Sequence, residues 1–124
     1  MQNGTTKKTG CVTPFDLFLL PFPFTDLRTT RQRPCLILAA FQPRGLPEHY
    51  VVAMVTSNLS GLTFPGDTQL AKWSEAGLPK PSVIRLAKVV TVERSLIRKT
   101  LGTLQAADQK AVRVQFRRVF AEVV

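Results

Sequence analysis

Prolines interrupt short apolar runs in the first third of the chain, and this pattern limits the fold more than any other feature. One run covers residues 17–20 and the next covers residues 35–38, with Pro21, Pro23 and Pro34 beside them. Short apolar runs bounded by proline and polar clusters are typical of buried strands rather than helices. Proline lacks a donor N–H and has a fixed φ, so these prolines belong at strand ends or sheet edges. The pattern predicts two strands joined by a polar, arginine-bearing loop.

Similar segments continue along the chain and predict a mainly β protein. We expect strands at residues 16–20, 35–40, 50–55, 67–73, 82–86, 89–92 and 100–104. Residues 67–73 also fit a short helix capped by Asp67, but Gly77 and two prolines close the segment quickly. Residues 93–99 fit a single helical turn. About six short strands of this kind predict a small, strongly bent sheet or barrel.

The pattern changes at Ala106, where a C-terminal helix is predicted. Apolar residues recur there at spacings of three and four, namely Val112, Phe116, Val119, Phe120 and Val123. They share one face of the helix, which we expect to cover the barrel. Asp108 lies in the first turn, where a carboxylate suits the helix dipole, although Gln105 is a weak N-cap.

Length and charge narrow the class of protein and of partner. The 124 residues fit one domain, residues 11–124, after a mobile polar tail at residues 1–10. The apolar content of 44% excludes disorder over most of the chain. A net charge of +9 favours an anionic partner, such as nucleic acid, an anionic membrane or an acidic protein segment.

The cysteine and histidine content argues against a metal site. Cys11, Cys35 and His49 cannot build an ordinary four-ligand zinc site, so we expect no metal and no cofactor. Two free thiols fit the reducing cytoplasm, with Cys35 as a small buried hydrophobe. The first ten residues lack the apolar core of a signal peptide, and residues 15–24 are too short to span a membrane. We therefore predict a cytoplasmic protein.

Polar residues at the ends of the predicted strands are the candidates for chemistry. Arg33 precedes Pro34, Thr56 and Ser57 follow an apolar strand, and Arg85 lies within another strand. Arginine offers planar donors that match phosphate, and a neighbouring hydroxyl can hold a second phosphate oxygen. The set suits binding or cleavage of a phosphodiester. Alternatively, the two arginines are salt-bridged surface residues, and His49 fits a surface residue better than a catalyst.

The charge surplus must lie mostly on the surface, because unpaired buried charge is prohibitive. We expect a basic groove along residues 28–33 that includes Arg28 and Arg31 and reaches Arg85 and Lys80. A nucleic acid would bind there chiefly through its phosphates. A diffuse positive surface that binds any polyanion is the alternative.

Several of these motifs resemble the PemK/MazF family of toxins from bacterial toxin–antitoxin pairs. The motifs occur in the family's order at residues 21–26, 33–34, 55–57, 76–86 and 91–92. The resemblance runs from about Asp16 to the C-terminal helix. It implies a compact SH3-like barrel of the CcdB type, a homodimer and metal-independent cleavage of single-stranded RNA. It also implies an antitoxin partner whose acidic tail lies over the groove.

The family's active-site residues carry over to named positions. Arg33 matches the arginine before proline, Thr56 with Ser57 matches the Thr/Ser that ends the central strand, and Arg85 matches an arginine with a catalytic role in some members. The implied reaction is attack of a ribose 2′-OH on the adjacent phosphorus. Ala87 stands where an Asp or Glu is common, so the general base is left open, with Asp16 and Asp26 to be tested.

Two other functions compete with this interpretation. Ala87 fits an RNA-binding or antitoxin-binding barrel that has lost catalysis. A relative that inhibits a protein target such as DNA gyrase, as CcdB toxins do, has no need of the phosphate site that Arg33 and Thr56 suggest.

Overall fold

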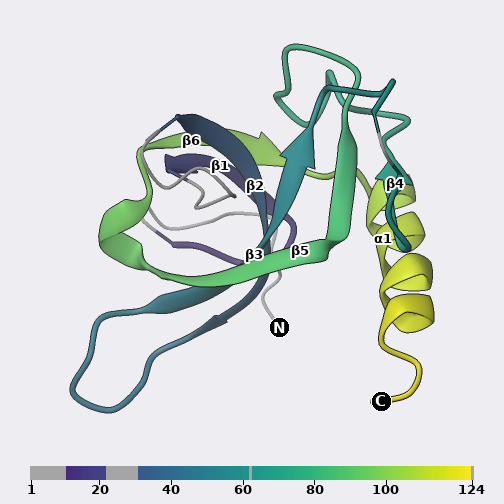
Figure 1. Cartoon of the computed structure of the whole chain (residues 1–124). Helices are drawn as coiled ribbons and strands as arrows, with labels where there is room; N and C mark the ends of the chain where they lie inside the picture. Colours follow the sequence, from purple (N-terminus) through teal and green to yellow (C-terminus); the bar gives the residue numbers. More distant parts are fainter. Residues whose placement is uncertain (1–10, 22–30, 62, 124) are drawn as a thin grey trace.

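The chain folds into one curled antiparallel sheet with a single C-terminal helix beside it (Figure 1). The computed structural model describes residues 11–21, 31–61 and 63–123. The elements are β1 (Asp16–Pro21), β2 (Gln32–Phe41), β3 (His49–Thr56), β4 (Thr68–Gln69), β5 (Val83–Glu93), a 3₁₀ turn (Arg94–Leu96), β6 (Lys99–Thr103) and α1 (Ala106–Val119). The strand order is β4-β5-β3-β2-β1-β6. The predicted small barrel-like β fold with a C-terminal helix is confirmed.

Alternating residues give the sheet two apolar faces, because successive side chains of a strand point in opposite directions. Leu17 of β1 packs on one face with Val112 of α1, and the next residue, Phe18, packs on the other with Tyr50. The first face is covered by α1 and by residues 70–78, whereas the second lies inside the curl of the sheet.

The segment predicted as two strands at residues 82–86 and 89–92 is one strand, β5, and that prediction was wrong. Ala53 of β3 pairs with Val89, but the next residue, Met54, pairs with Arg85. Residues 86–88 therefore form a bulge, which bends the strand without ending it. The strand predicted at residues 67–73 shrinks to Thr68–Gln69, because a hydrogen-bonded turn follows at residues 72–78.

The start of β2 also differs from the prediction. The strand begins at Gln32, so Arg33 and Pro34 lie inside it and not in the preceding loop. Pro34 pairs with Leu19 of β1, while the pairing with β3 starts only at Cys35. The proline is tolerated because this part of β2 is paired on one side. Pro21 ends β1 as predicted, and Pro23 lies outside the described residues.

Asp108 fixes helix α1 to the connection that follows β4. Its carboxylate is buried and accepts the backbone N–H groups of Ala71 at 2.9 Å and Lys72 at 2.8 Å. Val112 is buried and Phe116 is half-buried, as the apolar stripe predicted. Val123 does not belong to this stripe, because the helix ends at Val119 and 84% of Val123 is exposed.

The predicted tail at residues 1–10 lies outside the described part of the chain. Within that part, no helix combines the length and apolar character needed to cross a bilayer.

Candidate functional site

One end of the sheet collects the polar residues predicted from the sequence. Because the strands are antiparallel, β1 and β3 end where β2 and β5 begin. Leu20 pairs with Arg33, and Thr56 pairs with Val83. The β2–β3 pairing ends with Cys35 and Met54, so Arg33 and Thr56 each lie two residues beyond this last pair, at the same end of the sheet. The fold therefore brings Arg33, Thr56 and the start of β5 to the same end.

Arg33 is half-buried beside a buried thiol. The Sγ–H of Cys35 donates to the Arg33 carbonyl at 3.6 Å, and Cys35 is fully buried, as predicted. Burial raises the pKa of the Cys35 thiol far above its ordinary value, and the nearby Arg33 charge only partly offsets this. The thiol stays protonated and packs in the core. Other side chains are therefore the candidates for chemistry at this end of the sheet.

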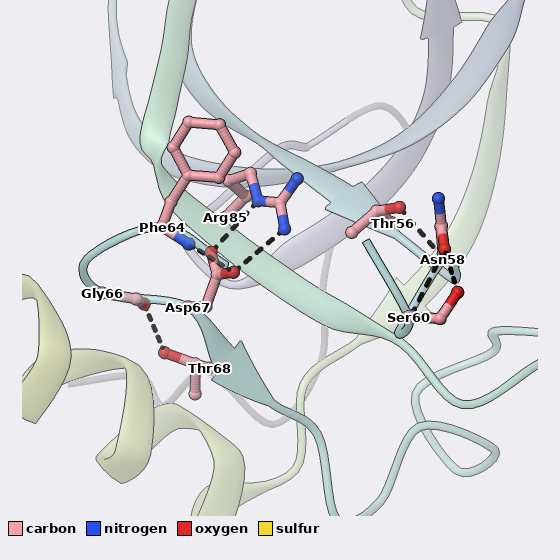
Figure 2. Close-up of polar contacts among 8 residues, drawn as sticks. All are labelled: Thr56, Asn58, Ser60, Phe64, Gly66, Asp67, Thr68 and Arg85. Atoms are coloured by element: carbon pink, nitrogen blue, oxygen red, sulfur yellow. Dashed lines mark hydrogen bonds and ion pairs between the residues drawn. The ribbon is translucent and has the colours of Figure 1, made fainter. Parts of the chain in front are cut away.

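The end of β3 presents one buried and one exposed hydroxyl. The buried Thr56 Oγ1 accepts the backbone N–H of Asn58 at 3.1 Å, whereas Ser57 is exposed. Asn58 in turn accepts the N–H and the hydroxyl of Ser60 at 3.3 and 3.1 Å (Figure 2). These bonds fix the direction in which the chain leaves the strand.

Arg85 is held by an acid that the sequence interpretation did not select. Its Nε and Nη2 donate to the two Asp67 carboxylate oxygens at 3.1 and 3.0 Å (Figure 2). The side chains are only 13% and 14% exposed, so the pair is largely shielded from water. The guanidinium also lies 4.4 Å from the centre of the Phe64 ring, and Lys88 Nζ lies 5.3 Å from it.

A tight turn at residues 64–67 delivers Asp67 to this position. Asp67 N–H donates to the Phe64 carbonyl at 3.1 Å, and Phe64 N–H donates to Asp67 Oδ2 at 3.0 Å. Pro65 followed by Gly66 at φ +85° is the pattern of a type II turn. A Cβ on Gly66 would lie 2.3 Å from Val119 Cγ2 of α1, so the turn rests directly on the helix. The Phe-Pro-Gly-Asp sequence was the available signal for this turn.

A surface hollow of about 190 Å³ lies between the loop that follows β3 and the Asp67–Arg85 pair. Its described lining comprises Asn58, Leu59, Gly61, Thr63, Asp67, Gln69, Val83 and Arg85. Amide, hydroxyl, carboxylate and guanidinium groups thus surround a cavity beside the end of β3. Such a mixture of donors and acceptors suits a polar ligand better than an apolar one.

Comparison with known proteins identifies the family. A family model for the PemK-like, MazF-like toxins of type II toxin–antitoxin systems matches residues 13–120. The chain belongs to this family.

Solved structures agree with the fold of this PemK/MazF-family chain. The Mycobacterium tuberculosis toxin MazF-mt6 superposes with a TM-score of 0.64 at 20% identity, covering 86% of this chain and 96% of that one. A mycobacterial endoribonuclease in complex with its cognate antitoxin gives a TM-score of 0.65 at 14% identity, with coverages of 90% and 96%. The MazE–MazF complex of Deinococcus radiodurans gives 0.59 at 20%, with coverages of 86% and 92%. No curated protein matches the chain.

The remaining predicted residues of this PemK/MazF-family chain lie around the same end or outside the described residues. Arg31 is exposed directly before β2, and Lys80 is exposed in the turn before β5. Ala87 is exposed within the β5 bulge. Arg28 and Asp26 lie outside the described residues. Within the described segments, no three His, Cys, Asp or Glu side chains are grouped as metal ligands.

The opposite end of the sheet carries a separate polar cluster. His49 begins β3 and its Nδ1 lies 2.7 Å from the Pro47 carbonyl oxygen, far along the strand from Thr56. The Tyr50 hydroxyl donates to Glu48 at 2.6 Å and accepts from Arg94 Nη1 at 2.9 Å. Burial, then the Glu48 hydrogen bond, raises the pKa of Tyr50. These hydrogen bonds connect the chain segments at the end of the sheet that is far from Arg33.

Proposed function

We propose that this PemK/MazF-family toxin is an endoribonuclease that cleaves single-stranded RNA without a metal ion. The observation that carries the proposal is that Arg33 and Thr56 lie at the same end of the sheet, each two residues beyond the last β2–β3 pair. A guanidinium and two hydroxyls close together can hold a phosphodiester from more than one direction. The excess of 17 basic over 8 acidic residues provides a general attraction for RNA.

In the proposed reaction, a ribose 2′-oxygen attacks the adjacent phosphorus. The bond between the 2′-oxygen and phosphorus forms while the bond from phosphorus to the 5′-oxygen breaks, which leaves a 2′,3′-cyclic phosphate and a free 5′-OH. Arg33 stabilises the negative charge that develops on the phosphoryl oxygens. The exposed Ser57 hydroxyl and the donor hydrogen of Thr56 position the phosphate. Arg85 supports the same end of the site through its pair with Asp67.

The family and the net charge support a proposal for the partners. Two of the solved relatives are complexes of a toxin or endoribonuclease with its antitoxin. We propose that this chain, as a homodimer, is likewise inhibited by an antitoxin, whose acidic tail competes with RNA for the basic groove.

The function is tested by incubating the purified protein with a long single-stranded RNA in the presence of EDTA. We expect discrete fragments that carry 2′,3′-cyclic phosphate and 5′-OH ends, and the same fragments when EDTA is omitted. Loss of cleavage in EDTA would contradict the metal-independent mechanism. RNA that is bound but remains uncut would instead favour the alternative that Ala87 suggests, a barrel that binds RNA without cleaving it.

The basic groove predicts a specific salt dependence. RNA affinity should fall with salt at a log–log slope near −0.7 for each phosphate neutralised. Substituting Arg28→Ala together with Arg31→Ala should make that slope shallower by about 1.4, if each arginine neutralises one phosphate. Titration of labelled RNA at several salt concentrations measures the slope.

The matched control is Lys110→Ala with Arg118→Ala, which removes the same charge from exposed positions of α1. We expect this pair to leave the slope unchanged. Equal effects of the two double variants would mean that RNA binds a diffuse positive surface. A slope unaffected by the Arg28 and Arg31 changes would place the RNA elsewhere.

A further inference from the structure

The proposed cleavage needs a group that accepts the proton of the 2′-OH, and Ala87 cannot supply it. Asp16, an alternative from the sequence, lies at the start of β1, whereas Arg33 pairs near the other end of that strand. Its buried carboxylate accepts the Thr13 N–H at 2.9 Å and the Thr103 hydroxyl at 2.8 Å. Asp16 therefore serves the fold.

Other described carboxylates are also committed elsewhere. Asp108 binds the backbone of Ala71 and Lys72, and Glu48 lies at the far end of β3 in the cluster with Tyr50. Glu75 is 54% exposed and pairs loosely with Lys72 at 3.9 Å. Among the described residues, Asp67 is the carboxylate that lines the hollow beside the end of β3.

The surroundings of Asp67 fix it in place and leave it an acceptor position. Oδ2 accepts the N–H of Phe64 and Nη2 of Arg85, whereas Oδ1 accepts only Nε of Arg85 among the described contacts. Each carboxylate oxygen has two lone pairs, so Oδ1 retains room for one more donor. A base that is held rigidly at a cavity wall meets the positional requirement of general-base catalysis.

We propose that Asp67 is the general base of the cleavage, an assignment that rests on the proposed function. Its carboxylate accepts the proton of the 2′-OH as the bond from the 2′-oxygen to phosphorus forms. The electron pair of the breaking phosphorus–oxygen bond goes to the 5′-oxygen, which takes a proton from water. Asp67 then releases to solvent the proton that it accepted from the 2′-OH. Arg85 acts as a positioning residue that holds the carboxylate, and the acid missing at Ala87 is replaced from a different segment of the chain.

The test compares Asp67→Asn with the wild type on a long single-stranded RNA. We expect kcat of the variant to be about a hundredfold lower than that of the wild type. The remaining rate should increase about tenfold for each unit by which the pH is raised, because hydroxide must then remove the proton. A matching RNA with 2′-deoxyribose at the mapped cleavage site measures binding without reaction. The variant should bind this RNA with an affinity within about twofold of that of the wild-type protein. Thermal melting confirms that the variant folds.

Two further variants make the assignment specific. Glu75→Gln changes the net charge by the same amount at an exposed position and should cleave at the wild-type rate. Asp67→Ala should regain cleavage when formate is added, since formate can occupy the space of the lost carboxylate and accept the proton.

Three results would overturn the assignment of Asp67 while leaving the proposed function intact. The first is a cleavage rate of Asp67→Asn within about twofold of the wild-type rate. The second is a loss of cleavage in Asp67→Asn that is matched by an equal loss of affinity for the deoxy RNA. The third is a cleavage rate of Asp67→Ala that does not increase when formate is added. Failure of the wild-type protein to cleave RNA would instead overturn the proposed function and this assignment together.

Discussion

Substituting Arg33→Ala is expected to lower the rate of RNA cleavage about a hundredfold to a thousandfold while the protein remains folded. Loss of one donor to a developing oxyanion costs about 3–4 kcal/mol of transition-state stabilisation. The effect should fall mainly on kcat, because the charge on the phosphoryl oxygens grows as the 2′-oxygen attacks. Single-turnover cleavage of RNA, with thermal melting alongside, measures both consequences.

Arg44→Ala is the matched control for this variant. Arg44 is exposed in the connection between β2 and β3, at the end of the sheet opposite Arg33, so its removal changes the net charge equally. We expect that variant to cleave at the wild-type rate. A wild-type rate for Arg33→Ala would show that the phosphate is stabilised by other groups.

Substituting Gly77→Ala should produce the largest loss of stability, about 4 kcal/mol or more in the free energy of unfolding. Gly77 has φ +94°, a conformation that already costs an L-residue about 1–2 kcal/mol. A Cβ there would lie 2.1 Å from the Leu101 carbonyl oxygen of β6, so the backbones themselves would have to separate. The melting temperature should drop by more than about 10 °C.

Gly45→Ala separates the two causes of this loss. Gly45 has a similar φ of +78°, but nothing lies within 4 Å of its would-be Cβ. Only the conformational cost of about 1–2 kcal/mol should therefore appear. Urea unfolding of both variants gives the comparison. If both variants lost the same free energy of unfolding, the close approach of residue 77 to β6 would make no contribution to the loss.

The β class and the C-terminal helix were predictable because they depend on local periodicity. Alternation around Leu17 and Phe18, and the three- and four-residue spacing from Val112 to Phe116, report directly which side chains face the core. The position of Thr56 at a strand end also follows from local sequence, because the apolar run stops there.

Features that depend on pairing between distant segments were not predictable in this way. The bulge that joins residues 82–86 and 89–92 into β5 exists only in the register against β3. Pro34 lies within β2 because of which neighbour is paired at that point, a fact absent from the strand's own sequence.

The candidate site also has some features that are visible in the local sequence and others that depend on contacts between distant segments. Arg33, Thr56 and Arg85 were selected from their places in the sequence, but the ion pair of Arg85 with Asp67 joins residues that are 18 positions apart. In the sequence, Asp67 fitted the cap of a short helix at residues 67–73. The Phe64 to Asp67 turn gives that carboxylate a different partner, which only the folded chain reveals.

The contact between Gly66 and Val119 gives α1 an influence that its sequence does not suggest. A Cβ added to Gly66 would lie 2.3 Å from Val119 Cγ2, so the turn and the last residue of the helix are in close contact. We therefore expect a change that tilts the end of α1 to displace Asp67 and, with it, the guanidinium of Arg85. Substitutions at the C-terminus of the helix are expected to alter the geometry of the hollow, although its described lining contains no side chain from the helix.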